Sequence, residues 1–369
     1  MKILVTGACR FIGKNLITEL NNEGYHDIYQ CDRHTTKDEL EEYTKDCEFI
    51  FHLAGAEETE KESEYKNINV DFTDELMQLL RKHDNKATIL YASSIYFENR
   101  KSYSQSKLFA ENLIKEHCKV MNSECFIYKL PMVFGKWSEP STAALVSYYS
   151  YHIAKHLEYE LIDENKEFEI CYVDDVFLEF IQAVEGKIDP KKEYYDIPII
   201  YHICVNDLIV QLQAFHDSRK NLSIPTIEGT LSRKLYSTYL TYVDSNEFCY
   251  DLVTHADNRG SLTEIFKGSS IGQISINVSK PGVSKGDHWH HTKCEKFVVL
   301  SGEGLIRFRK LDTENYIDYY VSGEKLQVVD VPVGYIHSVI NVGTTDLITL
   351  MWYSEPYNPA NKDTYIEKL

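Results

Sequence analysis

The sequence predicts an α/β fold, a doubly wound parallel sheet, followed by an all-β barrel. Three observations support this. The 369 residues exceed the size at which a single core usually stops growing. A short apolar strand, a glycine turn and an amphipathic stretch open the chain. After about Glu247 helical periodicity ends and short β segments follow one another. We expect domains at residues 1–245 and 246–369.

Composition and charge narrow the class of protein. Hydrophobic residues make up 43% and charged residues 26%, as in an ordinary globular protein. The net charge of −18 disfavours nucleic acid as a partner, because duplex binding relies on clustered Lys and Arg. A few local cationic groups can still hold an anionic small substrate.

Targeting signals are not evident in the sequence. Lys2–Thr6 is too short for the apolar region of a signal peptide, and no stretch of eighteen apolar residues predicts a membrane span. The nine cysteines are odd in number and scattered, without any C-x-x-C spacing. We therefore expect reduced thiols in a cytoplasmic protein.

The first strand, turn and helix are typical of a dinucleotide-binding unit. Lys2–Thr6 predicts a buried strand, and Asn15–Asn22 predicts an amphipathic helix. Between them Gly7 permits a tight turn, and Gly13 lets the helix pack closely on the strand. The N–H groups at the helix start would then face a pyrophosphate. Arg10 stands between the two glycines, where it crowds or grips a phosphate.

A second strand at Asp27–Cys31 ends in Asp32 and Arg33. An acidic residue at this point usually binds the adenosine ribose hydroxyls, whereas an arginine can hold a 2′-phosphate. The residues alone therefore leave NAD and NADP both open.

Acid–base residues follow the later strands. Phe49–Gly55 and Ala87–Ala92 predict two more strands, the second leading into Ser93 and Ser94. Tyr103 and Lys107 are four residues apart on a helical pattern, so they share one face. An ammonium near a phenol stabilises the phenolate, which makes the tyrosine a usable acid–base.

In order, Thr6-Gly7…Gly13, His52–Gly55, Asn69-Val70, Ser93-Ser94 and Tyr103…Lys107 resemble the extended short-chain dehydrogenase/reductases that act on nucleotide sugars. Lys129–Gly135 and Tyr172–Val176 resemble that family too. The resemblance implies Tyr103 as proton donor, Lys107 as its partner and Ser94 as the carbonyl-orienting hydroxyl, with Ser93 as the alternative. It implies a cofactor site at Gly7, Arg10, Phe11, Ile12, Gly13, Asp32, Arg33, Leu53, Ala54, Gly55, Asn69 and Lys107.

Residues 180–245 predict a packed connector without a flexible linker. Asp207–His216 predicts a helix, and the tyrosine-rich stretch Leu235–Val243 predicts an extended or amphipathic segment that packs rather than reacts. The strands expected after this connector are Gly272–Val278, Lys296–Leu300, Gly304–Phe308, Tyr316–Val321, Leu326–Val331 and Leu347–Tyr353.

Three histidines and a glutamate have the spacing of a metal site. His288 and His290 are two apart on an extended pattern, so both point to one side, while His291 would point outward. Glu295 and His337 come from neighbouring strands. Imidazoles with one carboxylate suit zinc, iron, nickel or manganese, and we expect one divalent ion, zinc.

The stretches Gly282–Gly302 and Pro332–Asn341 resemble the two motifs of the cupin family, although the leading glycine of the second motif is displaced to Gly323. Asp257–Glu264 is similar to the substrate-binding segment of cupin-fold dTDP-sugar epimerases. That resemblance implies that Arg259 binds a diphosphate and Glu264 a nucleobase. It also implies that His288 is a catalytic base, so its role as metal ligand or base stays open.

The order of the two domains resembles the bifunctional enzymes of capsular-polysaccharide biosynthesis. This implies C3 epimerisation of UDP-2-acetamido-2,6-dideoxy-4-hexulose by the cupin, then reduction at C4 with NADPH to UDP-N-acetyl-6-deoxy-L-talosamine, on the route to UDP-N-acetyl-L-fucosamine. A homodimer is implied as well. One alternative is a reductase whose cupin is only a metal-stabilised dimerisation module. Another is a regulator that senses NADP(H) without catalysis.

Overall fold

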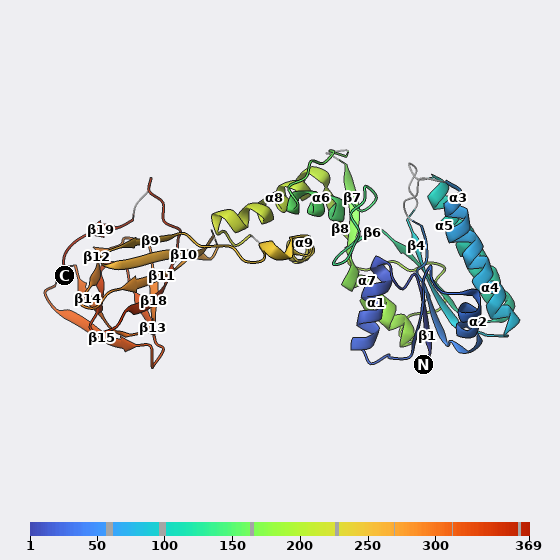
Figure 1. Ribbon diagram of the computed structural model, residues 1–369, viewed down its shortest axis with the longest axis horizontal. Helices are drawn as coiled ribbons and strands as arrows, with labels where there is room; N and C mark the ends of the chain where they lie inside the picture. The colour runs from blue at the N-terminus through green and yellow to red at the C-terminus, as the bar shows by residue number, and fades with distance from the viewer. Residues whose placement is uncertain are drawn as a thin grey trace. The chain divides into compact units, whose positions relative to one another are not determined.

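The computed structural model describes residues 1–56, 62–95, 101–162, 166–225, 229–268, 270–311, 313–360 and 363–369. The chain divides into two compact units (Figure 1). The first unit contains Met1–Gln213 and Gly229–Asp244, and the second contains Ala214–Glu228 and Ser245–Leu369. No helix formed by the described residues is both long and apolar enough to cross a lipid bilayer.

A parallel sheet of five strands forms the centre of the first unit, in the order β2-β1-β3-β4-β5. Three of these strands are short apolar runs that are almost wholly buried, as expected where helices cover both faces. The strands are β1 Ile3–Thr6, β2 Ile28–Cys31, β3 Phe49–His52, β4 Thr88–Ser94 and β5 Cys125–Leu130.

Helices cover both faces of this sheet. Helices α1 and α7 lie on one face, and α2, α4 and α5 lie on the other (Figure 1). The helices are α1 Phe11–Asn22, α2 Lys37–Asp46, α3 Glu62–Tyr65, α4 Phe72–Lys82, α5 Lys101–Met121 and α7 Val173–Val184. Each face has its own hydrophobic cluster, so the prediction of a doubly wound sheet is confirmed.

Strand order determines where a ligand can bind in this unit. In the order β2-β1-β3, the connections leave β1 and β3 in opposite directions, and a crevice opens at their carboxyl ends. A π-helix, Lys66–Asp71, interrupts the run from α3 to α4 near this crevice. Such turns are rare and often mark functional sites.

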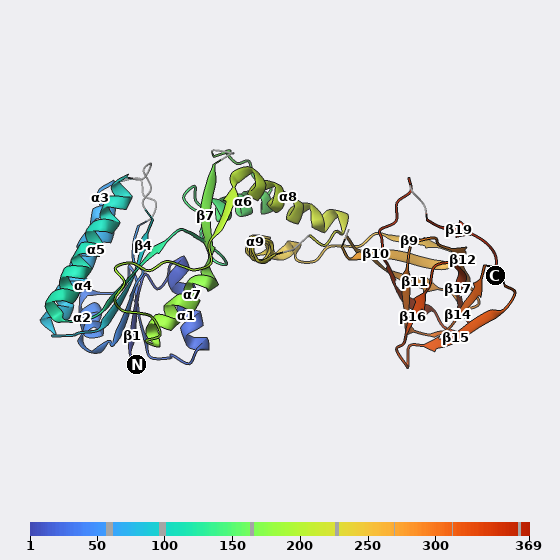
Figure 2. The same ribbon diagram turned by 180° about the vertical axis from the view of Figure 1, so that it is seen from behind.

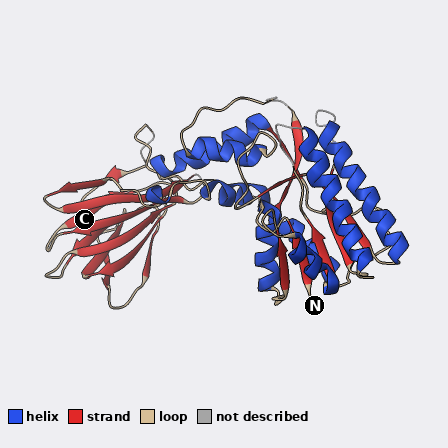
Figure 3. Ribbon diagram, turned by 45° about the vertical axis from the view of Figure 1, so that its right-hand side comes forward, coloured by secondary structure: helices blue, strands red, loops and turns tan. Residues whose placement is uncertain are grey.

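The remaining elements before the barrel form a small sheet and three helices, which Figure 3 shows in red and blue. They are β6 Met132–Phe134, α6 Leu145–Ala154, β7 Glu167–Tyr172, β8 Tyr201–Cys204, α8 Val205–Asn221 and α9 Thr230–Leu240. Helix α9 resolves the open interpretation of the tyrosine-rich stretch, because Leu235 and Tyr239 lie buried on one face of it.

The second unit is a barrel of two antiparallel sheets, as Figure 2 shows. One sheet has the order β16-β13-β18-β11-β10-β9, and the other has β15-β14-β17-β12-β19. The strands are β9 Thr254–Asp257, β10 Gly260–Gly268, β11 Gly272–Ser279, β12 Ser284–Trp289, β13 Glu295–Ser301, β14 Glu303–Lys310, β15 Tyr316–Ser322, β16 Val328–Val331, β17 Tyr335–Asn341, β18 Leu347–Tyr353 and β19 Tyr365–Ile366.

The interior of the barrel is apolar in one part and polar in another. Phe297 and Met351 of the first sheet pack with Ile306 and Val339 of the second. Strand β11 instead turns polar side chains inward, and all four are buried: Gln273, Ser275, Asn277 and Ser279. An interior that mixes apolar packing with buried polar groups is typical of a ligand-binding barrel. The predicted all-β C-terminal fold is confirmed.

Candidate functional site

Two glycines of the opening turn are required by their surroundings. Gly7 has a φ of +71°, and a Cβ there would lie 2.9 Å from the backbone nitrogen of Ala54. A Cβ on Gly13 would lie 2.2 Å from the carbonyl oxygen of Gly7. Both positions therefore exclude side chains, and α1 can start directly against β1.

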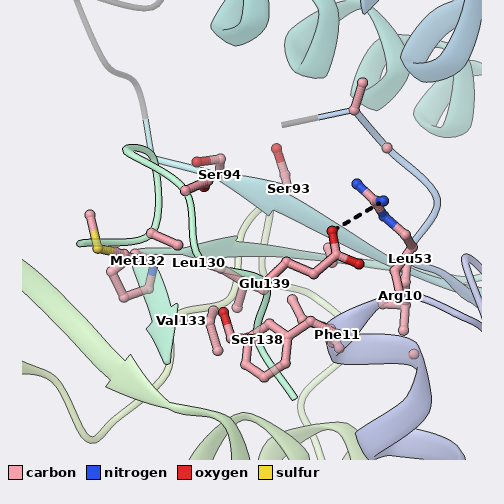
Figure 4. A pocket seen from close by; sticks show the side chains of 18 of the residues that line it. Arg10, Phe11, Leu53, Ser93, Ser94, Leu130, Met132, Val133, Ser138 and Glu139 are labelled. Atoms are coloured by element: carbon pink, nitrogen blue, oxygen red, sulfur yellow. Dashed lines mark ion pairs between the residues drawn. The ribbon is translucent and has the colours of Figure 1, made fainter. Parts of the chain in front are cut away.

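A cavity of about 490 Å³ opens where β1, β3 and β4 end (Figure 4). The start of α1 forms one wall, because Arg10 at the N-cap provides no side-chain cap and the first-turn N–H groups remain available to a ligand. The cavity is lined by Arg10, Phe11, Ile12, Gly13, Leu53, Gly55, Ala56, Ala92, Ser93, Ser94, Tyr103, Lys107, Leu130, Pro131, Met132, Val133, Ser138, Glu139, Pro140, Ser141 and Ala144.

Tyr103, Lys107 and Ser94, the residues predicted to carry the chemistry, all line this cavity. Tyr103 and Lys107 lie four residues apart on α5, and both side chains are buried. The Lys107 ammonium donates to the carbonyl oxygen of Ala92 at 2.7 Å and lies 4.3 Å from the centre of the Tyr91 ring. The backbone of β4 thus fixes the ammonium at the cavity wall.

Ser93 and Ser94 differ in their surroundings. The Ser93 hydroxyl donates to the carboxylate of Glu111, which is fully buried and also accepts from the ammonium of Lys129. Both serines line the cavity, but Ser94, at the end of β4, is half-buried, whereas Ser93 is buried. Of the two hydroxyls, that of Ser94 is the better placed for a ligand.

Asn69 holds the cavity wall rather than lining it. Its side-chain oxygen accepts from the N–H of Ala56 at 2.7 Å, and its amide donates to the hydroxyl of Ser106 at 2.8 Å. The Ser106 hydroxyl in turn donates to the carbonyl of Tyr103 at 2.7 Å. This buried amide therefore connects the loop after β3 to the helix that carries Tyr103.

A directed chain of hydrogen bonds supports the same loop. The Thr73 hydroxyl donates to Asn69 at 2.8 Å, so it accepts from Nε2 of His52. Nδ1 of His52 then accepts from the Thr6 hydroxyl, whose oxygen accepts the N–H groups of Leu53 and Ala54. Burial and the nearby Lys107 lower the pKa of His52 to about 3. The ring therefore stays neutral, which this series of hydrogen bonds requires, because Nδ1 accepts one of them.

Arg10 reaches across the cavity mouth to Glu139. Their charged groups lie 3.7 Å apart and both are largely exposed, which Figure 4 shows as a dashed line. An exposed ion pair of this kind is weak, so a phosphate can compete for the guanidinium.

Asp32 and Arg33 lie in the turn after β2 and do not line the cavity. The Asp32 carboxylate accepts the N–H of His34 at 2.8 Å, and the Arg33 guanidinium is exposed. Ala54 and Gly7 also lie behind the wall, although both contact residues that form it.

In the barrel, His288, His290, Glu295 and His337 meet as predicted, and their ligand atoms all lie within 4.8 Å of one another. Nε2 of His290 lies 3.0 Å from one oxygen of Glu295, and Nε2 of His337 lies 3.1 Å from the other. Atoms bound at about 2.1 Å to one ion are separated by roughly 3 Å, so the cluster has the spacing of a metal site.

The negative charge of Glu295 also favours the binding of a cation in this cluster. Burial alone would raise the pKa of Glu295, but the imidazoles of His290 and His337 hold that pKa well below its usual range. Nε2 of His337 and its nearest Glu295 oxygen are buried and form no hydrogen bond of good geometry. A bound cation would neutralise the ionised carboxylate and would give both buried atoms a partner.

His288 is the least buried member of the cluster. Burial and the nearby His337 lower the pKa of its imidazole to about 4, so the ring is neutral at pH 7 and can bind a metal or accept a proton. His291, left out of the predicted site, is exposed and packs against Tyr365.

Arg259 and Glu264 pair with residues that do not belong to this cluster. The Arg259 guanidinium is exposed and pairs with Asp257 at 2.7 Å. Glu264 accepts from Gln273 at 3.2 Å and pairs with Lys267 at 3.3 Å. In the sheet register Glu264 is opposite Ser275, whose side chain points into the barrel.

Sequence reasoning missed three supporting groups: Glu111, the Ser138–Ala144 segment of the cavity wall, and Asp363, which binds the loop beside His290. Glu111 had a signal, because it follows Lys107 by four residues and so shares the face of Tyr103. The other two had none, since neither spacing nor composition indicates them.

Comparison with known proteins agrees with this architecture. Residues 3–197 match the model of the NAD dependent epimerase/dehydratase family, and residues 255–365 match the polysaccharide biosynthesis C-terminal domain. A UDP-2-acetamido-2,6-beta-L-arabino-hexul-4-ose reductase of Pseudomonas aeruginosa is 35% identical over 369 residues, covering 99% of this chain and 98% of that relative.

Solved structures also match this two-domain architecture. The crystal structure of the capsular polysaccharide assembling protein CapF of Staphylococcus aureus matches with a TM-score of 0.92 and 39% identity, and the match covers 100% of both chains. UDP-glucose 4-epimerase of Thermotoga maritima, at 19% identity and a TM-score of 0.54, covers 66% of this chain and 98% of its own and supports the fold alone. The chain belongs to the NAD dependent epimerase/dehydratase family, in the two-domain form that carries a polysaccharide biosynthesis C-terminal domain.

Proposed function

We propose that this protein is a bifunctional nucleotide-sugar enzyme of capsule or surface polysaccharide biosynthesis. The barrel epimerises C3 of UDP-2-acetamido-2,6-dideoxy-4-hexulose, and the N-terminal unit reduces the C4 ketone to UDP-N-acetyl-6-deoxy-L-talosamine. The observation that carries the reductase is the convergence of Tyr103, Lys107 and Ser94 on one cavity beside a glycine turn. The name of the Pseudomonas aeruginosa relative supports the 4-keto substrate.

For the reduction, a nicotinamide cofactor bound in this cavity would supply the hydride for C4. The Tyr103 hydroxyl donates a proton to the ketone oxygen as negative charge develops on it. The Lys107 ammonium, fixed by the carbonyl of Ala92, stabilises the resulting phenolate. The Ser94 hydroxyl donates to the same ketone oxygen and orients it.

NADPH is the proposed cofactor. Gly7 and Gly13 allow the diphosphate to approach the start of α1. The Asp32 carboxylate caps the turn that follows β2, whereas the Arg33 guanidinium is exposed and can take a 2′-phosphate. NAD remains the alternative to be compared in binding assays.

For the barrel we propose one divalent metal ion, zinc, held by His288, His290, Glu295 and His337. Such an ion would polarise a carbonyl oxygen as a Lewis acid. The 3.0 and 3.1 Å separations between Glu295 and two imidazoles support this donor set. A single carboxylate with three imidazoles is a donor set that zinc accepts.

The epimerisation depends on acidity next to a carbonyl. The C4 ketone acidifies the proton at C3, so a base can remove it and the carbon can be reprotonated on the opposite face. Arg259 and Glu264 are the proposed contacts to the diphosphate and the base of the nucleotide. Arg259 directly precedes β10 and Glu264 lies within it, so one edge of the barrel would provide both contacts to the nucleotide.

Two roles of His288 can be separated by one substitution. If His288 is a ligand, His288→Ala lowers zinc affinity together with C3 exchange. If it is the base, the variant keeps its zinc and loses exchange. Because all four ligand atoms cluster within 4.8 Å, we propose the ligand role.

We also propose a homodimer formed through the barrel. On the outer face of the β11 sheet, Ile274, Ile276 and Leu350 are only half-buried, and the neighbouring Val328 is 61% exposed. A contiguous apolar face of this kind marks an interaction site. Light scattering of the wild-type chain and an Ile276→Asp variant tests it; a monomeric wild type would contradict the dimer.

The proposed function is tested with the full chain, a UDP-4-keto-6-deoxy sugar and heavy water, without NADPH. We expect deuterium at C3 in the wild type and in Tyr103→Phe, because exchange depends on the barrel. Absence of exchange in this assay, together with NADPH oxidation in a parallel assay that contains the coenzyme, would leave a reductase whose barrel is only a dimerisation module.

A further inference from the structure

The C-terminal segment 363–369 is built into the wall of the histidine cluster. Strand β19 pairs with β12, which places Ile366 opposite His288 and Tyr365 opposite Trp289. The Trp289 and Tyr365 rings stack with centroids 4.7 Å apart. The segment is therefore part of the sheet that carries the first histidine of the cluster.

Asp363 begins this segment, and its carboxylate organises the loop between His290 and Glu295. One oxygen accepts the N–H of His291 at 2.8 Å. The other accepts the N–H groups of Thr292 and Lys293, each at 2.8 Å, and the Thr292 hydroxyl at 3.0 Å. These four hydrogen bonds fix all but one of the residues that connect the two proposed ligands.

The same residue also contacts a proposed ligand directly. The carbonyl oxygen of Asp363 accepts a hydrogen bond from Nδ1 of His290. This bond fixes the orientation of the ring and leaves Nε2 directed at Glu295, 3.0 Å away. Hydrogen bonds to the outer nitrogen of a metal-binding histidine typically tune both its geometry and its basicity.

The rest of the segment keeps Asp363 in place. The N–H of Glu367 donates to the carbonyl of Asp287 at 3.0 Å. The guanidinium of Arg309, on β14, donates to Glu367 at 3.2 Å and to the carbonyl of Lys368 at 3.1 Å. The segment is thus held by β12 and by β14.

We infer that Asp363 is a positioning residue for the proposed metal centre: its carboxylate sets the 291–293 loop and its carbonyl sets the His290 ring. The inference rests on the proposed metal site. It predicts that the placement of a carboxylate that is not a ligand controls metal affinity, because loss of the loop hydrogen bonds would release both His290 and Glu295 from their relative positions.

The test uses the full chain with Asp363→Asn, which keeps the size of the side chain but replaces one acceptor oxygen by an N–H donor. The matched control is Asp318→Asn, which removes another carboxylate of the same barrel, paired with Arg307 at 2.7 Å. Zinc affinity is measured by competition with a chelator. The visible spectrum of the cobalt-substituted proteins reports ligand geometry.

We expect Asp363→Asn to weaken zinc binding about tenfold or more and to change the cobalt spectrum, while Asp318→Asn alters neither. If Asp363→Asn does not fold, Asp363→Glu replaces it, since it keeps the charge but shifts the carboxylate by one methylene. Wild-type zinc affinity with an unchanged cobalt spectrum in the folded variant would overturn the inference alone. A wild-type chain that binds no zinc would overturn the proposed metal site and the inference with it.

Discussion

Ser93 donates a hydrogen bond to the buried carboxylate of Glu111, so the first of two adjacent serines at the end of β4 is committed to the protein interior. Glu111 also pairs with Lys129, which lies opposite Ser93 on β5. Both serines line the cavity, and Ser94 is the less buried of the two. This arrangement favours Ser94, the residue that the resemblance implied, over Ser93, its alternative.

The first prediction concerns these serines. Ser94→Ala should lower kcat for C4 reduction by about 100-fold, the typical effect of removing one donor to a developing oxyanion. Ser93→Ala should mainly lower the free energy of unfolding, because it leaves a buried carboxylate short of a donor. Steady-state kinetics and urea unfolding of both variants check this. A larger kinetic loss in Ser93→Ala would exchange the two roles.

The second prediction concerns the proton donor. Tyr103→Phe removes one oxygen from a buried ring and should lower kcat by 100-fold or more, because the ketone oxygen loses its acid. Binding of NADPH, followed by fluorescence, should stay within about twofold of the wild type. Unchanged turnover would remove Tyr103 from the mechanism, whereas a wild-type chain that binds NADPH but turns over no keto sugar would favour a regulator that senses the cofactor without catalysis.

The fold could be predicted from the sequence because its signals are local. The glycine turn at Gly7 and Gly13 and the apolar strands of the first unit specify the parallel sheet. After Glu247 the helical periodicity of the apolar residues gives way to short β segments, and this change predicts the barrel. Helix α9 could not be distinguished from an extended segment, since its tyrosines fit either pattern and burial of Leu235 and Tyr239 decides between them.

The site was predictable only where chemistry and spacing coincide. The grouping of His288, His290, Glu295 and His337 could be predicted because their spacing is typical of metal ligands on paired strands. The Ser138–Ala144 segment and Asp363 could not be predicted, because the residues that they contact are distant in sequence. Asp363, for example, binds a loop 70 residues earlier, and nothing in its neighbours indicates this contact.

The third prediction concerns the ion pair across the cavity mouth. Glu139→Gln should strengthen NADPH binding severalfold, because it frees the Arg10 guanidinium and removes a negative charge near the phosphates. Arg10→Gly, which supplies a glycine between Gly7 and Gly13, should weaken binding if the guanidinium holds a phosphate. Titration calorimetry at two salt concentrations measures both effects. Tighter binding by Arg10→Gly would show that Arg10 only obstructs the site.

The fourth prediction concerns stability at mildly acidic pH. The pKa of His52 is about 3 in the folded protein and about 6.5 in the unfolded chain, so below pH 6.5 protons bind preferentially to the unfolded chain. His52 should therefore remove about 1.4 kcal/mol of stability between pH 7.5 and pH 5.5. Urea unfolding of His52→Asn should show a pH dependence that is flatter by this amount. An equal slope in variant and wild type would contradict the buried neutral ring.

The most direct test combines both reactions in one tube. The wild-type chain is incubated with a UDP-2-acetamido-2,6-dideoxy-4-hexulose and NADPH in heavy water, absorbance follows NADPH, and NMR identifies the product. We predict one NADPH oxidised per sugar and a product with deuterium at C3, inverted at that carbon and reduced at C4. A sugar recovered with its ketone and its C3 configuration unchanged, and with NADPH unconsumed, would contradict the account.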